Sequence, residues 1–202
     1  MTDPTLQTYE TAAERYREQT RQAGPDLLDF LDRLAALAGP GAHVLEIGSG
    51  PGNDAVLLEA RGLRVTRTDA TKAFVAMMQA DGFEAAVLDV RTDDLGGPYD
   101  AVLADAVLLH LTRDEFALAL RKARAAAGLL AFTLKEGDGD AWTTAKLDLP
   151  RHFTYWREEP LREVLTSTGW WPVAIERVQG REPWLYVLCH ASLEGAPDPS
   201  RD

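Results

Sequence analysis

A buried strand that runs directly into a glycine-rich turn constrains this chain more than any other feature of its sequence. The stretch reads Val44-Leu45-Glu46-Ile47-Gly48-Ser49-Gly50-Pro51-Gly52-Asn53-Asp54. Glycines at such a turn allow positive φ angles and let the backbone approach a ligand closely, where a side chain would interfere. The turn therefore predicts a nucleotide-binding site at the end of a strand.

The carboxylate of Glu46 indicates which kind of nucleotide this is. A dinucleotide site places a pyrophosphate over the turn and the following helix N-terminus, and a carboxylate there would oppose that charge. A ligand that carries a sulfonium and an ammonium would be favoured instead. Gly48, Gly50 and Gly52 also follow G-x-G-x-G spacing, whereas the dinucleotide fingerprint is G-x-G-x-x-G. We therefore predict a site for S-adenosylmethionine (SAM).

Composition limits the classes of protein to which this chain can belong. Its 202 residues, 46% of them hydrophobic, suit one globular domain. The one cysteine, Cys189, excludes a disulfide framework, a cysteine-rich zinc site and the three-cysteine iron–sulfur cradle of radical enzymes. A formal net charge of -11 would repel phosphate backbones, which makes a nucleic-acid substrate unlikely on electrostatic grounds.

The start of the chain and its hydropathy bear on localisation. Met1-Thr2-Asp3-Pro4 lacks a basic region followed by an apolar run, and no segment approaches the ~20 apolar residues of a membrane span. We therefore expect a cytoplasmic protein without membrane association.

Periodicity predicts two helices followed by alternating strands and helices, which is the pattern of βαβ units and a mostly parallel sheet. The expected helices are 7–22, 26–38, 53–61, 72–80, 113–126 and 160–168; the expected strands are 43–47, 64–68, 84–88, 99–104, 128–134, 170–178 and 184–190. The last two strands are joined by a short link, which allows only antiparallel pairing. We expect one domain over 1–193, with a helical lid over 1–40 and a core over 41–193, and a disordered tail over 194–202.

Acidic residues follow three of the expected strands. Ligands of open α/β sheets bind outside the carboxyl ends of the strands, so these positions are candidate ligand contacts. Asp69 follows Gly48 by about 20 residues, the spacing at which an acidic residue reaches ribose hydroxyls. Asp89 is expected beside the adenine edge, where it could accept from the exocyclic amine, and Asp105 beside the sulfonium and amino end.

Together these motifs resemble the Rossmann-like (class I) SAM-dependent methyltransferases, in order and spacing. The resemblance rests on Glu46 to Asn53, Asp69, Asp89, the segment 104–111, the opening segment 9–16 and the later segments 134–137 and 151–156, Leu161, Leu165 and Gly169-Trp170. The later segments look like the small-molecule branch of that superfamily. The resemblance implies a three-layer α/β fold with a seven-stranded sheet whose last strand is antiparallel, and SAM as the methyl donor with S-adenosylhomocysteine (SAH) as product.

The residues that we expect to hold the cofactor lie in the glycine turn, at the strand ends and in the first helix. They are Glu46, Gly48, Ser49, Gly50, Gly52, Asn53, Asp69, Ala70, Asp89, Val90, Asp105 and Tyr16.

Two histidines are candidate bases, because histidine titrates near neutral pH. His110 lies in an apolar segment where the resembling family has a structural histidine, and His152 lies beside Phe153, Tyr155 and Trp156. Methyl transfer from a sulfonium is a direct displacement, so an acceptor that is already ionised needs no base.

The expected acceptor pocket is aromatic. It consists of Tyr9, Trp142, Phe153, Tyr155 and Trp156, with Arg151, Arg157 and Lys146 near enough to pair with an acceptor carboxylate. The N-terminal helix and the segment 142–156 are expected to form a lid over the carboxyl edge of the sheet.

Two related enzyme types are disfavoured. The Asn/Asp-Pro-Pro-aromatic tetrad of nucleic-acid amino methyltransferases is replaced here by Ala104-Asp105-Ala106-Val107. A metal-dependent catechol type would need convergent acids such as Asp105, Asp138 and Asp140, but Asp138-Gly139-Asp140 is typical of a turn, so no metal is predicted.

The sequence thus predicts a SAM-dependent methyltransferase that acts on an oxygen, or a nitrogen, of a small metabolite, with oxygen preferred, as a monomer or homodimer. The alternatives are a protein or peptide carboxyl or amino methyltransferase, a non-catalytic SAM-binding protein and a dinucleotide-binding oxidoreductase.

Overall fold

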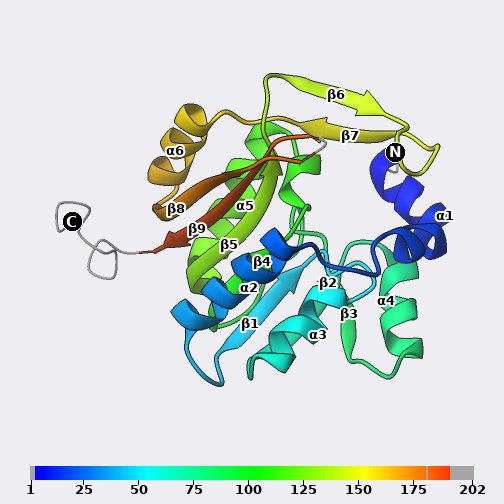
Figure 1. The fold of residues 1–202 in the computed structure, drawn as a ribbon, viewed down its shortest axis with the longest axis horizontal. Coiled ribbons are helices and arrows are strands. Elements are labelled where there is room, and N and C mark those ends of the chain that lie inside the picture. Colours follow the sequence, from blue (N-terminus) through cyan, green and yellow to red (C-terminus); the bar gives the residue numbers. More distant parts are fainter. Residues whose placement is uncertain (1–2, 181, 192–202) are drawn as a thin grey trace.

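Alternating strands and helices build a seven-stranded sheet with helices on both faces, as the sequence predicted (Figure 1). The computed structural model describes residues 3–180 and 182–191, so the tail expected over 194–202 lies outside the described residues. The strands of the sheet are β1 (His43–Ile47), β2 (Arg64–Asp69), β3 (Ala85–Val87), β4 (Tyr99–Ala104), β5 (Ala127–Lys135), β8 (Trp171–Val178) and β9 (Trp184–His190).

The strand order β3-β2-β1-β4-β5-β9-β8 places a topological switch point between β1 and β4. From β1 the chain winds outward through β2 and β3, then returns to pair β4 with the other side of β1, with Leu45 opposite Val102. In the seven-stranded sheet, β9 runs opposite to the other strands and pairs antiparallel with both β5 and β8. Open α/β sheets bind ligands outside the carboxyl ends of the strands at such a point, so the loops after β1 and β4 define the candidate site.

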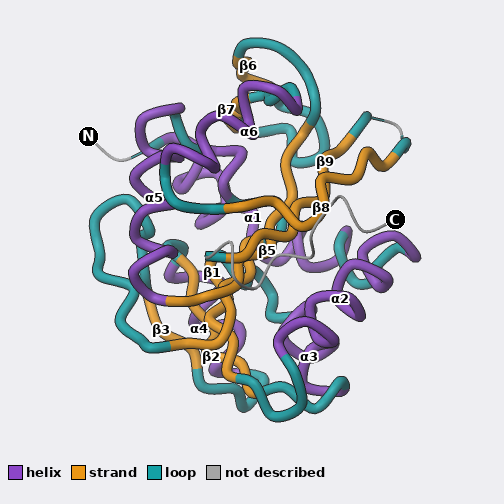
Figure 2. Tube along the Cα trace, turned by 90° about the vertical axis from the view of Figure 1, so that its left-hand side faces the viewer, coloured by secondary structure: helices purple, strands orange, loops and turns teal. Residues whose placement is uncertain are grey.

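Two apolar clusters hold helices on opposite faces of the sheet (Figure 2). On one face, α2 (Pro25–Ala38) and α3 (Asn53–Ala60) pack against the strands; Phe30, Leu31 and Leu58 are almost fully buried there. On the other face lie α5 (Arg113–Ala126) and α6 (Glu158–Ser167), with Phe116 and Leu161 buried. The helix α2 therefore belongs to the core, although the sequence suggested a lid over 1–40.

The helices begin where local signals dictate. Thr112 and Glu115 form a reciprocal capping box at the start of α5, which satisfies two backbone N–H groups that a helix N-terminus leaves free. Asp3 caps α1 (Pro4–Gln19) by accepting from the N–H groups of Thr5 and Leu6. The helix α4 (Lys72–Ala80) receives a long-range cap, because the Glu10 carboxylate of α1 accepts from two of its first N–H groups.

A small hairpin of β6 (Asp140–Thr143) and β7 (Arg151–Thr154) was not anticipated from the sequence. It leaves the sheet after β5 and lies beside α1 in Figure 1. Two hydrogen bonds join them: the Thr8 hydroxyl donates to the carbonyl of Pro150 (2.6 Å), and the N–H of His152 donates to Thr5 Oγ1 (3.1 Å). The first helix and this hairpin, far apart in sequence, thus form one cover.

Among residues 3–180 and 182–191, no helix is both long enough and apolar enough to cross a membrane.

Candidate functional site

The glycine turn after β1 has the geometry that its sequence predicted. Gly48 has φ +68°, and a Cβ there would lie 2.4 Å from Cγ2 of Val107, so a side chain is excluded by the loop after β4. Gly52 has φ +85° at the residue preceding α3, with Met78 3.2 Å from where its Cβ would be. Both positions require glycine for their backbone angle and for close packing.

Asp69, at the end of β2, holds this turn in place. Its two carboxylate oxygens accept from the N–H of Gly50 (2.9 Å) and from the N–H of Thr71 (2.7 Å). Burial raises the pKa of Asp69, and these two hydrogen bonds oppose that shift. The Thr71 side chain also hydrogen-bonds to Asp69, but a carboxylate has about four acceptor positions, so Asp69 can still accept from a ligand's hydroxyl groups.

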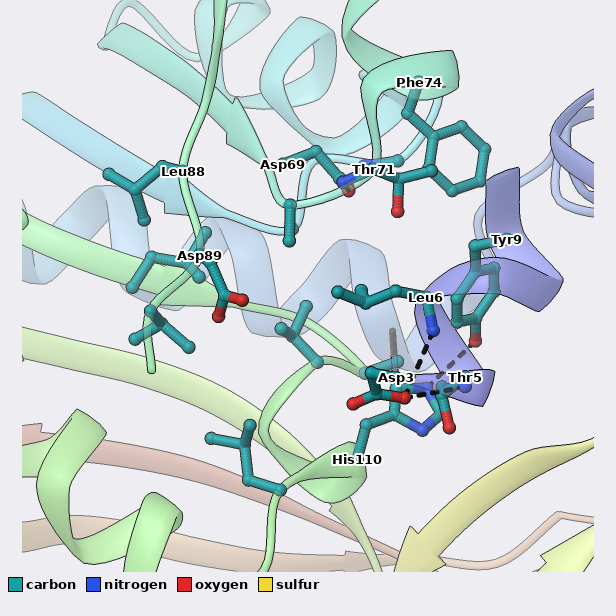
Figure 3. Close-up of a pocket in the computed structure, with 18 of the residues that line it drawn as sticks. Asp3, Thr5, Leu6, Tyr9, Asp69, Thr71, Phe74, Leu88, Asp89 and His110 are labelled. Carbon is teal, nitrogen blue, oxygen red and sulfur yellow. Dashed lines mark hydrogen bonds between the residues drawn. The ribbon is translucent and has the colours of Figure 1, made fainter. Parts of the chain in front are cut away.

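A first cavity lies above the carboxyl ends of β1, β2 and β4 (Figure 3). Figure 3 shows Asp69 and Thr71 at one side, Leu88 and Asp89 at another, and Tyr9 and His110 closing it from α1 and the loop after β4. Its lining includes these predicted cofactor residues: Gly48, Gly50, Asp69, Ala70, Asp89, Val90, Asp105 and Tyr16. Sequence reasoning missed Phe74, whose aromatic ring lines the same cavity. The packing of α4 brings this ring to the cavity, and no local sequence pattern predicts that position.

Asp89 lines the first cavity but is already neutralised by a cation. Nε and Nη2 of Arg91 donate to its carboxylate, and Arg91 also forms an ion pair with Asp3. Burial by itself would raise the pKa of Asp89, but the hydrogen bonds and charge of Arg91 outweigh it and hold the pKa below its usual value. The side chains of Asp89, Arg91 and Asp3 thus join the loop after β3 to the start of α1.

A second cavity adjoins the first and is lined by three acidic residues, of which Asp54 and Asp105 lie together and Asp26 comes from α2. The Thr133 hydroxyl donates to Asp105 Oδ1 at 2.6 Å, and the two carboxyl groups are themselves hydrogen-bonded. Burial, together with the neighbouring carboxylate charges, raises the pKa of Asp54; burial raises that of Asp105. Two acids held together in this way form a site that favours a positively charged ligand group. Asp54 was not singled out from the sequence, although it directly follows Asn53.

Glu46 of β1 is buried and does not form part of the lining of this second cavity. It is 2% exposed, and Oε2 has no hydrogen-bond partner among the described residues. Burial raises the pKa of Glu46 to about 7, and the charges of Asp105 and Asp69 add to the shift. Asp54 and Asp105 therefore line the second cavity directly, whereas Glu46 is buried outside its lining. Ser49 and Asn53 do line the cavity.

A third cavity opens between α1, the β6–β7 hairpin and the end of β5. Of the residues expected in the acceptor pocket, Tyr9, Phe153 and Tyr155 line it. Trp184 of β9 also lines it, although the acceptor pocket expected from the sequence did not include that residue. Three cations line it as well: Lys135, Lys146 and Arg151.

Two of the predicted acceptor residues lie elsewhere. Trp156 is 3% exposed and packs in the core, with its ring centroid 4.7 Å from that of Phe116 and Arg113 over its face. Trp142 is 54% exposed and stacks on His152 on the outside of the hairpin. The structure does not bring either tryptophan to the cavities: Trp142 lies on the opposite face of β6, since side chains alternate along a strand, and Trp156, which follows β7, packs into the apolar core.

The two candidate bases are placed differently. His110 lies between the first and third cavities, and both of its ring nitrogens are engaged: Nδ1 with the carbonyl of His152 (2.6 Å) and Nε2 with Tyr9 Oη (2.9 Å). Burial lowers the pKa of His110 to about 4, so its ring is neutral near pH 7. The His152 side chain pairs with Asp140 at 3.0 Å on the hairpin's outer face, away from the cavity lining.

Tyr16 and Ala106 each line all three cavities. Ala106 follows β4 with φ +53°, and its N–H donates to Thr133 Oγ1 (2.9 Å). Tyr16 reaches the same point from α1, and burial raises the pKa of its hydroxyl, which keeps it protonated. The three cavities therefore meet at one place beside the switch point of the sheet.

Within residues 3–180 and 182–191, no three His, Cys, Asp or Glu side chains are arranged to hold a metal ion.

Solved structures share this fold along nearly the whole chain. The CcbJ methyltransferase from Streptomyces caelestis superposes with a TM-score of 0.75 at 18% identity, covering 95% of this chain and 100% of that one. Magnesium protoporphyrin IX methyltransferase from Synechocystis PCC 6803, with bound SAH, superposes with a TM-score of 0.73 at 18% identity, covering 93% of this chain and 97% of that one. The 1,6-didemethyltoxoflavin-N1-methyltransferase of Burkholderia thailandensis, with bound 1,6-didemethyltoxoflavin and SAH, superposes with a TM-score of 0.71 at 19% identity, covering 94% of this chain and 91% of that one.

Among curated proteins, none matches this sequence significantly. The family described as "Methyltransferase domain" matches residues 16–175, which is well over half of the chain and includes the glycine turn, Asp54, Asp105 and the hairpin. The chain therefore belongs to the methyltransferase-domain family, which confirms the resemblance to class I SAM-dependent methyltransferases seen in its sequence.

Proposed function

We propose that this protein transfers the methyl group of SAM to an oxygen atom of a small-molecule acceptor. The observation that carries this proposal is the meeting of three cavities at Tyr16 and Ala106. Two cavities suit the two ends of the cofactor, and the third offers an acceptor a path to the point where those ends join.

The residues of the first two cavities fit SAM. Phe74, Leu88 and Val90 supply apolar surface for an adenine ring, and Asp69 has free lone pairs for the ribose hydroxyls. Asp54 and Asp105 supply negative charge for the ammonium and sulfonium groups. The backbone of Gly48 and Gly50 lines these cavities without a side chain in the way. Structural neighbours solved with SAM or SAH support the same cofactor.

An oxygen acceptor is favoured over an amine because the third cavity is lined by cations. Lys135, Lys146 and Arg151 would repel an amine that is protonated near neutral pH. An oxygen nucleophile carries no such charge. The cations of the third cavity thus support the preference for oxygen that the sequence already indicated.

A small acceptor is favoured over a protein because α1 and the hairpin enclose the third cavity together. Nη1 of Arg15 donates to the carbonyl of Leu147 (2.7 Å), and Thr8 donates to the carbonyl of Pro150. These bonds join the helix to the segment between β6 and β7, so a folded protein surface would have to displace them to enter.

The reaction needs alignment more than acid–base chemistry. SAM, when bound, supplies an electrophilic methyl group, and displacement is fastest when the acceptor is held in line and water is excluded. Tyr16 and Ala106 exclude water from the point of transfer, and Phe153 with Tyr155 orients the acceptor. His110 is neutral and hydrogen-bonded at both nitrogens, so it holds Tyr9 in position and does not take a proton from the acceptor directly.

Calorimetric titration of the protein with SAM, SAH and NAD tests this proposal. SAM and SAH are expected to bind in the micromolar range, and Asp69→Ala to weaken both by ~1.5–3 kcal/mol because hydrogen bonds of a charged group to the ribose are lost. The variant must be compared at a temperature where circular dichroism shows it folded, since Asp69 also holds Gly50 and Thr71. Tight NAD binding with no SAM binding would overturn the proposal.

A further inference from the structure

The third cavity is cationic in a protein whose overall charge is strongly negative. Three positive side chains line it, Lys135, Lys146 and Arg151, whereas Glu182 is the one acidic side chain in its described lining. Glu182 forms an ion pair with Lys135, which leaves Lys146 and Arg151 without a carboxylate partner among the described residues. Like charges that face one cavity repel each other, so this arrangement favours a negatively charged occupant.

Arg151 is the buried member of this group. It is 6% exposed, and Nε has no hydrogen-bond partner in the described part of the chain. Its other nitrogens donate to Tyr9 Oη (3.2 Å) and to the carbonyl of Ala145 (2.6 Å), and both partners are uncharged. A buried guanidinium is costly unless an anion is near, and a two-oxygen anion matches its planar donors.

Lys146 brings its charge to the point where the cavities meet. Its Nζ lies 4.6 Å from the centroid of the Tyr16 ring, and its backbone has φ +74°, a conformation that side-chain-bearing residues adopt rarely. Burial lowers the pKa of Lys146, and the charges of Arg151 and Lys135 lower it further. An anion between these side chains would relieve that repulsion.

We propose that the acceptor carries an oxyanion, of the carboxylate or the phosphate type, and that Arg151 and Lys146 bind this group. The apolar body of the acceptor then lies against Phe153, Tyr155 and Trp184, which line the same cavity. This inference rests on the proposed function, because it assigns the third cavity to the methyl acceptor.

Thermal unfolding of the SAH-saturated protein with small anions tests the inference. The probes are phenylacetate and phenylphosphonate, each compared with the uncharged phenylacetamide at constant ionic strength. At least one anion should raise the melting temperature in a saturable manner while the amide does not, because a ligand that binds only the folded state stabilises it. Comparison of the two anions distinguishes a carboxylate from a phosphate-type acceptor.

The variant Lys146→Met carries the test, because Lys146 is exposed enough for its loss to leave the fold intact. It should raise the dissociation constant of the effective anion at least about tenfold, since a hydrogen bond to a charged group is lost. Arg157→Met is the matched control: Arg157 pairs with Asp138 outside the cavity, and its loss should leave anion binding unchanged. Arg151→Lys, which keeps the charge, should bind with intermediate affinity.

SAH binding is measured first on the same samples, so the two proposals fail separately. Loss of SAH binding in the wild type would contradict the proposed function. Intact SAH binding with no stabilisation by either anion would contradict the proposal that the acceptor carries an oxyanion. Equal anion affinity in the Lys146 and Arg157 variants would contradict it as well.

Discussion

The hydroxyl of Tyr9 lies 2.9 Å from Nε2 of His110, although 101 positions separate the two residues. A carbonyl can only accept, so Nδ1 of His110 carries the proton that it donates to His152, and Nε2 accepts from Tyr9. The Tyr9 oxygen in turn accepts from Arg151. One directed chain of hydrogen bonds therefore runs along the wall of the third cavity, from Arg151 through Tyr9 to His110.

Tyr9→Phe tests whether this chain positions Arg151 for the acceptor. Removing the hydroxyl takes one uncharged partner from the guanidinium, so we expect the acceptor KM to rise about 5- to 10-fold with the SAM dissociation constant changed less than about threefold. Steady-state methylation with an identified acceptor measures the KM, and calorimetry measures the SAM dissociation constant. Tyr99→Phe, remote from the three cavities, is the control, and an equal effect there would show that Tyr9 acts only through stability.

Glu46→Gln tests the buried charge beneath the glycine turn. Because the folded pKa of Glu46, about 7, lies above the ordinary value of 4.5, the folded state holds a proton that the unfolded state has released between these pH values. The extra proton stabilises the folded state. This contribution to the free energy of unfolding is fully present below pH 4.5 and is lost as pH rises through 7, by roughly 3 kcal/mol. Urea unfolding at pH 5 and pH 8 should therefore show a smaller pH dependence in the variant than in the wild type.

The same variant should bind SAM more weakly above pH 7, where the wild-type carboxylate is ionised and attracts the ligand's positive charges. Glu163→Gln on the exposed side of α6 is the control for both measurements. A pH dependence identical to that of the wild type would mean that Glu46 does not titrate in this range.

Trp156→Ala separates packing from acceptor binding. Trp156 is 3% exposed against Phe116, so its truncation should lower the free energy of unfolding by ~3–5 kcal/mol through the cavity it leaves. Trp142→Ala, at an exposed position on the hairpin, should cost less than about 1 kcal/mol. Urea denaturation of the two variants compares them directly. A raised acceptor KM without loss of stability would return Trp156 to the acceptor pocket.

Deleting the residues through Gln22 tests the lid. The core helix α2 remains, so the sheet should fold, but methyl transfer should be lost because Tyr9 and Tyr16 are removed from the cavities. Cofactor affinity should also fall, since Asp3, Thr5 and Leu6 of the same segment line the first cavity. Circular dichroism measures folding, calorimetry measures cofactor affinity, and a methylation assay measures turnover. Full activity in the truncated protein would show that α1 does not cover the site.

Local patterns were sufficient to predict the sheet. Buried β-branched and aliphatic runs alternate with amphipathic helices, and each signal lies within a dozen residues, so the strands β1, β4 and β9 and the helix α5 begin and end close to where the sequence placed them. The hairpin escaped prediction because its strands have only four residues each, with charged and polar side chains among the aromatics. Its stability comes from contacts with α1, which no local pattern reports.

By itself, the sequence determined the family, the glycine turn and Asp69, because these depend on backbone angles and spacing that a short segment specifies. Only the tertiary structure decided which side chains reach the cavities. It placed Trp156 in the core and Trp142 on the surface, brought Asp54 and Asp105 but not Glu46 into the lining of the second cavity, and gathered Lys135, Lys146 and Arg151 around the third cavity. Such convergence arises from packing between segments that no short stretch of sequence contains together, and burial, which sets the charge state of each group, exists only once those segments have met.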